Sequence, residues 1–206
     1  ISSALHASPW GGDELYRPVA SLSLALNWYV GQGNVLGYHV VNLVIHCLTA
    51  VFLMQAVVLL LRTPLLKDHY PSYPATYWIA LLTATLWAIH PIQTQAVTYI
   101  VQRMASLAGL FYIIGIFCFL KGHLHQKSLN KFFWFVATVI AYLLAMGAKE
   151  NAAIFPLALV LIEIAFFRAE ILSTRKRRLA VATTLSFAIL IGVVGILITS
   201  DDFVAS

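Results

Sequence analysis

The chain has 206 residues, of which 61% are hydrophobic and only 10% are charged, and its formal net charge is +5. Its mean hydropathy is +0.85, and this composition excludes an ordinary soluble globular protein. The positive charge does not indicate a nucleic-acid partner, because the basic residues lie in short connections between apolar runs and form no basic face. We therefore expect an all-α, polytopic integral membrane protein.

Residues 1–36 are expected to form an outer-side loop followed by an interfacial helix. The loop contains proline, paired glycines and the acids Asp13 and Glu14, which favour turns. The following stretch VASLSLALNWYV has apolar residues at helical spacing but is too short to cross a bilayer. Gly31 and Gly33 should end this helix. The chain does not begin with methionine, and we expect a segment of a longer protein to precede it.

Apolar runs of spanning length predict about six transmembrane helices, which together form a domain over residues 37–200. They cover approximately residues 37–61, 77–89, 105–120, 132–146, 152–167 and 179–199. The second run is short unless its helix begins near Tyr73. The fourth and fifth are joined by only a few residues, which requires an antiparallel hairpin. Residues 201–206 are expected to form an outer-side tail.

The second and third runs are connected by a polar segment, residues 89–102, which we call the elbow. Pro91 cannot donate a backbone hydrogen bond and biases His90 away from helix, so the second helix should end there. A bilayer excludes irregular backbone, so the elbow must lie at an interface or line a wet cavity. The elbow is therefore the expected place for chemistry.

The first spanning run carries His39, Asn42 and His46 on one helical face. Polar groups at membrane depth turn toward the protein interior or a water-filled cavity. Two interpretations stay open for this face. The side chains either form hydrogen bonds between helices or line a substrate site.

Other polar residues near the apolar runs have simpler interpretations. His123 and His125 have the spacing of a metal-binding pair, but no third ligand lies nearby in the sequence, so a solvated loop is favoured and no metal is expected. Glu163 should extend toward Arg168 at the membrane boundary. Both cysteines, Cys47 and Cys118, are expected to be packing residues.

The basic residues are distributed unequally between the two sides of the predicted membrane domain. Ten lie in one set of connections: Arg62, Lys67, Lys121, Lys127, Lys131, Arg168, Arg175, Lys176, Arg177 and Arg178. The other side holds only Arg17, Arg103 and Lys149. The positive-inside rule makes the first side cytoplasmic, so the elbow faces the periplasm or lumen. The membrane is then a bacterial inner membrane or one of the endoplasmic-reticulum type.

The cations on the outer side suggest a bound anion. Arginine binds phosphate with two parallel hydrogen bonds, whereas lysine acts as a point charge. In this interpretation Arg103 faces outward and contributes little to packing. The alternative is that Arg103 and Lys149 form structural ion pairs with Glu150. The candidate residues for binding substrate or lipid phosphate are Arg17, His39, His90, Arg103, Lys149 and Glu150.

Four segments, in order and spacing, resemble the GT-C-fold membrane glycosyltransferases related to the tetratricopeptide-containing transmembrane O-mannosyltransferases. They read LYRPVASLSLALN, GYHVVNLVIH, AIHPIQTQAVTYIVQRMASLAGLFY and AKENAAIFPLALVLIE, and the resemblance covers about residues 14–170. It implies a GT-C-like fold and inverting transfer of a sugar from a polyprenyl-phosphate carrier, on the outer face. Arg17, Arg103 and Lys149 match the family's basic positions and would stabilise the departing phosphate, while His90 would hydrogen-bond to phosphate or sugar.

The sequence also departs from the family's pattern. The family's first span and the acidic pair that supplies its catalytic base should precede residue 1, and its repeat domain is absent from these 206 residues. Gln95 stands where the family commonly has glutamate, and an amide cannot take up a proton. The candidates for a catalytic base in this sequence are Asp13 and Glu14, which lie away from the expected place.

Two functions of different classes therefore stay open. The first is a polyprenyl-phosphate-sugar-dependent glycosyltransferase, with a lipid-linked sugar as donor and no identified cofactor. The alternative is a non-catalytic membrane subunit that keeps the GT-C-like fold to hold lipid or to assemble a complex. The expected partners are membrane lipids, the donor, and a protein acceptor or partner subunit, without nucleic acid. A transporter or channel has less support, because charged residues are scarce within the spans.

Overall fold

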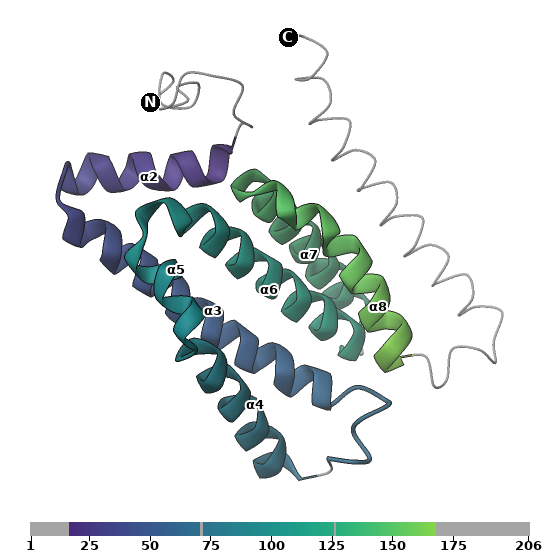
Figure 1. Cartoon of the computed structure of the whole chain (residues 1–206). Coiled ribbons are helices and arrows are strands. Elements are labelled where there is room, and N and C mark those ends of the chain that lie inside the picture. The colour runs from purple at the N-terminus through teal and green to yellow at the C-terminus, as the bar shows by residue number, and fades with distance from the viewer. Residues whose placement is uncertain (1–16, 71, 126, 168–206) are drawn as a thin grey trace.

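The computed structural model describes residues 17–70, 72–125 and 127–167, and helices are the only regular secondary structure among them (Figure 1). The all-α prediction is thus confirmed. The α-helices are α2 (Pro18–Gly31), α3 (Val35–Leu61), α4 (Tyr73–Ala88), α5 (Thr94–Thr98), α6 (Arg103–Leu124), α7 (Ser128–Ala148) and α8 (Phe155–Phe167). Short 3-10 helices are η1 (Pro91–Gln93), η2 (Ile100–Gln102) and η3 (Glu150–Ile154).

Within the described ranges, 4 helical segments are long and apolar enough to cross a membrane, and the bent pair Tyr73–Ala88 and Pro91–Thr98 brings the number to 5. The chain is therefore an integral membrane protein. These segments match the first five predicted runs, and α4 begins at Tyr73, as its length required. The predicted sixth span, the tail at 201–206 and residues 1–16 of the predicted outer-side loop lie outside the described residues.

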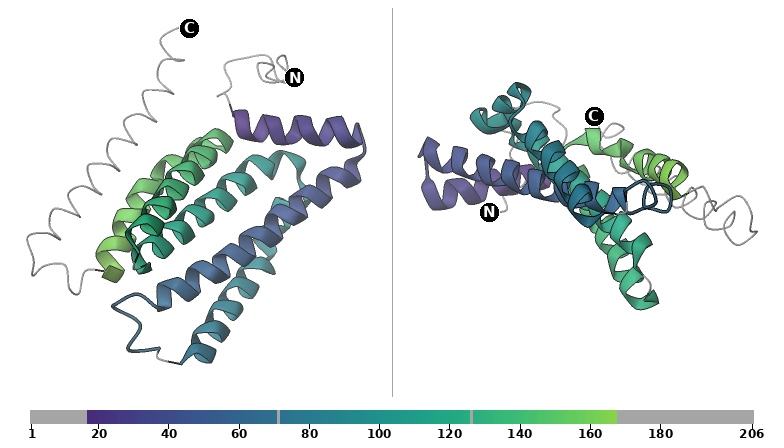
Figure 2. Two further views of the ribbon diagram at one scale, coloured as in Figure 1. Left: turned by 180° about the vertical axis from the view of Figure 1, so that it is seen from behind. Right: turned by 90° about the horizontal axis from the view of Figure 1, so that it is seen from below.

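The predicted interfacial helix is α2, which crosses the end of the bundle where α6 begins and α7 ends (Figure 2). Pro18 occupies the first turn, where its missing N–H costs nothing. The helix ends at Gly31, but the residue with positive φ is Gln32, at 50°. Val19 lies so close to Gly147 that a Cβ there would be 2.7 Å from Val19 Cγ2. Helix α2 therefore packs directly on the end of α7.

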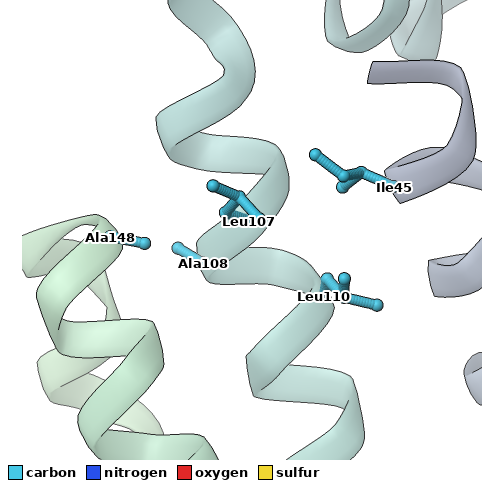
Figure 3. Packing of buried hydrophobic residues seen from close by; sticks show 5 residues of the cluster. All are labelled: Ile45, Leu107, Ala108, Leu110 and Ala148. Carbon is cyan, nitrogen blue, oxygen red and sulfur yellow. The ribbon is translucent and has the colours of Figure 1, made fainter. Parts of the chain in front are cut away.

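Helix α6 lies between α3 and α7 and forms the centre of the molecule (Figure 3). Its buried side chains meet those of both neighbours in one apolar cluster, made of Ile45, Leu107, Ala108, Leu110 and Ala148. The contact with α8 is also close, because a Cβ at Gly115 would lie 2.5 Å from Phe155 Cζ. Small residues let helix backbones approach in this way. The predicted antiparallel hairpin is formed by α7, η3 and α8.

The far ends of α6 and α8 correct the prediction for His123. His123 Nε2 lies 3.3 Å from Glu163 Oε2, and the His123 ring packs against Phe119 and Phe167. The solvated-loop interpretation of His123 is wrong, because α6 continues to Leu124 and turns the ring into the bundle. Glu163 is only 8% exposed and faces this histidine.

Three further expectations concern the same end and the cysteines. Arg168, toward which Glu163 was expected to extend, lies outside the described residues. In the part of the chain that the structure describes, no group of three or more His, Cys, Asp or Glu could hold a metal ion. Cys118 is buried as expected, whereas Cys47 is exposed on α3.

Candidate functional site

The site begins where α4 breaks. His90 has extended backbone angles (φ −62°, ψ 132°) and its Nδ1 accepts a hydrogen bond from the Ile92 N–H at 3.2 Å, which caps η1. The predicted end of the helix before Pro91 is therefore confirmed. The elbow then runs alongside the first half of α3 and leads into α6 (Figure 1). His90 itself is exposed, and its Nδ1 is used by this cap.

The break frees carbonyl groups of α4, and α3 supplies a partner for the last of them. The Nε2–H of His46 donates to the Ala88 carbonyl at 3.0 Å. The same imidazole ring stacks on Trp87, with ring centroids 5.1 Å apart. An unpaired carbonyl in a bilayer would cost several kcal/mol. His46 thus makes the break tolerable at membrane depth.

The remainder of the polar face of α3 binds the second half of the elbow. The Nδ1–H of His39 donates to the Val97 carbonyl at 3.2 Å. The Asn42 Nδ2 group donates to the carbonyls of Tyr99 at 3.3 Å and Val97 at 3.5 Å. These contacts are the interhelical hydrogen bonds of the first interpretation. The face holds the elbow in place.

Arg103 is directed inward, and the expectation that it faces outward with little packing is wrong. Its side chain is 0% exposed, and its Nε–H donates to Asn42 Oδ1 at 2.8 Å. The terminal nitrogens donate to the carbonyls of Tyr38 at 2.9 Å and Ser23 at 3.4 Å. The first residue of α6 therefore joins α2, α3 and α6. Among the described residues no carboxylate forms an ion pair with it.

Arg17 is the partner of Glu150, which corrects the predicted structural pairs of Glu150 with Arg103 or Lys149. The Arg17 Nε–H donates to Glu150 Oε2 at 3.1 Å, and the second N–H group donates to Oε1 at 2.9 Å. Such a two-bond pair is the strong geometry for arginine and carboxylate. It connects the start of α2 to the turn between α7 and α8.

Two adjoining cavities form a cleft between α3, α4 and the elbow on one side and α6 on the other, and the turn that contains η3 lines one of its ends. The first, about 240 Å³, is the elbow pocket, and its polar lining is His46, Thr49, Gln93, Gln95, Gln102 and Ser106. The second, about 360 Å³, is the lysine pocket, which is lined by Thr49, Leu53, Tyr112, Ile113, Lys149 and Asn151 among others. Both share Thr49, Trp87, Ala105 and Gly109, so they are parts of one cleft.

Gly109 lies where the two pockets meet. Apart from its chain neighbours and the nearby backbone of its own helix, no heavy atom lies within 4 Å of the position that a Cβ would take. The residue is exposed although the α6 residues on both sides of it, Ala108 and Leu110, are buried. A Cβ at this position would therefore find open space, and a side chain here would occupy part of the cleft.

The structure brings few of the candidate residues into the cleft. Lys149 lines it, as does Gln95, whereas Arg17, His39, His90, Arg103 and Glu150 are not among the lining residues. Asp13 and Glu14 lie outside the described residues. Sequence reasoning missed Ser106, Tyr112 and Asn151. A signal existed on α6, because Gln102, Ala105, Ser106, Gly109, Tyr112 and Ile113 form one helical stripe of mostly small or polar residues.

Comparison with known proteins finds relatives that are much longer. The chain is 31% identical over 144 residues to protein O-mannosyl-transferase TMTC2 of Mus musculus, covering 68% of this chain and 15% of that protein. It is 33% identical over 144 residues to tmtc2 of Xenopus laevis, with the same coverage of 68% and 15%. It is 26% identical over 140 residues to TMTC4 of Homo sapiens, covering 66% and 19%.

The chain thus spans less than a fifth of the length of these curated relatives, at 15% to 19%. No family model matches the sequence. No solved structure matches it either, so the GT-C-like fold stays a prediction from sequence resemblance.

Proposed function

We propose that this chain, which is related in sequence to the TMTC protein O-mannosyl-transferases, is part of the membrane domain of an enzyme that transfers mannose to protein. The relationship covers about two thirds of the chain, at 66% to 68%. The observation that carries the proposal is the cleft, where one lysine and several amide side chains line a cavity beside a broken helix. Such a concave site with convergent polar groups is typical of ligand binding.

The cleft has chemistry suited to a polyprenyl-phosphate-linked mannose. The Lys149 ammonium would attract the phosphate and stabilise the charge that develops as the lipid phosphate departs. The amides of Gln93, Gln95 and Gln102 can both donate to and accept from sugar hydroxyls. The apolar wall near Leu53 and Ile113 suits the lipid chain. Each part of such a donor therefore has a matching part of the cleft.

A carboxylate base is not among the described residues that line the cleft. His46 lines the elbow pocket and donates its Nε2–H to the Ala88 carbonyl, which leaves Nδ1 as the one ring nitrogen that can accept a proton. Gln95 can orient an acceptor hydroxyl but cannot remove its proton. We propose that the base comes from Asp13, Glu14 or a further segment of a longer protein.

The cleft is proposed to face the lumen or periplasm. The basic residues Arg62, Lys67 and Lys127 lie in the two connections at the opposite ends of the helices, and Lys121 and Lys131 lie in the helical turns next to the second connection. The positive-inside rule assigns that side to the cytoplasm. Transfer on the outer face requires a donor that has already crossed the membrane, which is what a polyprenyl carrier provides.

Binding of a lipid-linked donor tests the proposal. We expect polyprenyl-phosphate mannose with radiolabelled sugar to bind the chain in phosphatidylcholine nanodiscs. Gly109→Leu should reduce this binding at least about tenfold, because the side chain fills the cleft. The matched control is Ala153→Leu, at an exposed alanine of η3 that does not line the cleft. Equal binding by wild type and Gly109→Leu would place the donor elsewhere.

The non-catalytic subunit remains the second candidate, because the described lining of the cleft lacks a carboxylate and carries Gln95. This candidate keeps donor binding but has no transfer. Measuring mannose transfer to a protein acceptor by the longest available form of the protein separates the two. Donor binding with no transfer would favour the subunit.

A further inference from the structure

The three cations near the outer end of the bundle have different environments. Arg103 is buried among neutral acceptors, Arg17 is paired with Glu150, and Lys149 lines the cleft. In the described ranges the only carboxylate residues are Asp68, Glu150 and Glu163. Asp68 lies in the α3–α4 connection, and Glu163 contacts the far end of α6. Glu150 is thus the described carboxylate that neighbours Lys149.

The backbone at Lys149 directs the two adjacent side chains apart. Lys149 is extended, with φ −161° and ψ 139°, between the end of α7 and η3. Successive side chains on extended backbone point in opposite directions. Lys149 accordingly lines the cleft, while Glu150 meets Arg17 at the start of α2. No hydrogen bond or ion pair joins the Lys149 ammonium to another described residue.

This arrangement has an electrostatic consequence for any anion in the cleft. The paired Arg17 and Glu150 contribute no net charge, so the Lys149 charge is left to attract a ligand. Without Arg17, the Glu150 carboxylate would lie uncompensated beside Lys149. Charges near a protein surface interact more strongly than in bulk water, because the effective dielectric constant there is lower. The carboxylate would then attract the ammonium and repel the ligand.

We propose that Arg17 is a positioning residue that keeps Lys149 available to a phosphate ligand by neutralising Glu150, without touching the ligand itself. The inference rests on the proposed function, since the phosphate is that of the lipid-linked donor. It assigns to Arg17 a role different from direct phosphate binding. It also predicts that replacing Arg17 and replacing Glu150 have unequal effects on phosphate binding, although the two residues form one ion pair.

The test measures binding of farnesyl phosphate and of inorganic phosphate to the chain in phosphatidylcholine nanodiscs. Arg17→Met should weaken binding of farnesyl phosphate about tenfold, because it exposes the Glu150 charge. Glu150→Gln should leave binding unchanged or tighten it. The double variant Arg17→Met, Glu150→Gln should bind as well as wild type. Tighter binding of farnesyl phosphate than of inorganic phosphate identifies the ligand as a lipid phosphate.

Both single variants remove the same ion pair, and Arg17→Met also removes the contact of Arg17 Nη1 with Met104 Sδ at 3.1 Å. If the pair is purely structural, both variants weaken binding, which overturns the inference. Thermal unfolding of both variants measures the stability that each one loses. A double variant that stays as weak as Arg17→Met would also overturn it, because Arg17 would then be a direct ligand. If the wild type binds neither probe, the proposed function itself fails, which is distinct from failure of the variant pattern.

Discussion

The two sides of α6 are built in different ways. Toward α7 and α8 the helices are continuous and close, and Gly115 leaves room for nothing but the Phe155 ring. Toward α3 and α4 one helix is broken at His90, and polar side chains from α3 bind the released carbonyls. The elbow pocket lies on this second side, and the lysine pocket extends from it to η3. A broken helix at membrane depth requires polar partners, and the same requirement creates a polar, hollow site.

The largest loss of stability is expected from replacing Arg103, whose hydrogen bonds join α6 to α2 and α3. Arg103→Leu leaves the Asn42 Oδ1 without its donor and removes the second donor to the Tyr38 carbonyl, which also accepts a bond within α3. The expected loss is about 3 kcal/mol in the free energy of unfolding, since each buried polar group left unpaired costs about 1–3 kcal/mol. Unfolding by sodium dodecyl sulfate in mixed micelles measures it.

Arg103→Lys serves as the control for charge. It should lose roughly half as much stability, because a point charge cannot bind three acceptors as the guanidinium does. A loss below about 1 kcal/mol for Arg103→Leu would contradict the structural role assigned to this arginine.

The second-largest loss of stability is expected on the closely packed side of α6, toward α7 and α8. Gly115→Leu would force a side chain into the Phe155 ring, where even a Cβ meets Cζ at 2.5 Å. Overpacking of this kind costs about 1–3 kcal/mol. The same unfolding titration should show the loss, and replacing Phe155 with alanine in the same chain should recover part of it. No effect of Gly115→Leu would mean that α6 and α8 are not in close contact.

Removing the single hydrogen bond that His46 makes at the end of α4 should cost less stability. His46→Phe keeps a ring to stack on Trp87 but removes the donor to the Ala88 carbonyl. The expected loss is about 1 kcal/mol, and amide hydrogen exchange should increase in the elbow more than in α7. Uniformly faster exchange in both regions would argue against a local role for His46.

The smallest effect on stability is expected at Gly109, where the comparison with Gly115 is most direct. Gly109→Leu makes the same substitution on the same helix but enters open space. Stability should change by less than about 0.5 kcal/mol or should increase, because glycine disfavours helix. Donor binding should nevertheless be lost. A strongly destabilised Gly109→Leu would mean that the cleft is filled in solution.

Local features of the sequence determined the spans and their interruption. Hydropathy predicted the helices that became α3, α6, α7 and α8, and Pro91 predicted the end of α4. These outcomes depend on residues within a few turns of one another, since burial in lipid and backbone geometry act locally. The shared face of His39, Asn42 and His46 followed from helical spacing for the same reason.

Tertiary structure alone decided the partners of the charged groups. Glu150 bonds to Arg17, 133 positions away in the chain, although Lys149 is its neighbour in sequence. His123 meets Glu163 only because α6 and α8 lie together at their far ends. Arg103 turned out to be buried since the rotation of α6 aims it between α2 and α3. Charge and hydropathy specify which residues need a partner, whereas the packing of helices distant in sequence selects which partner each one meets.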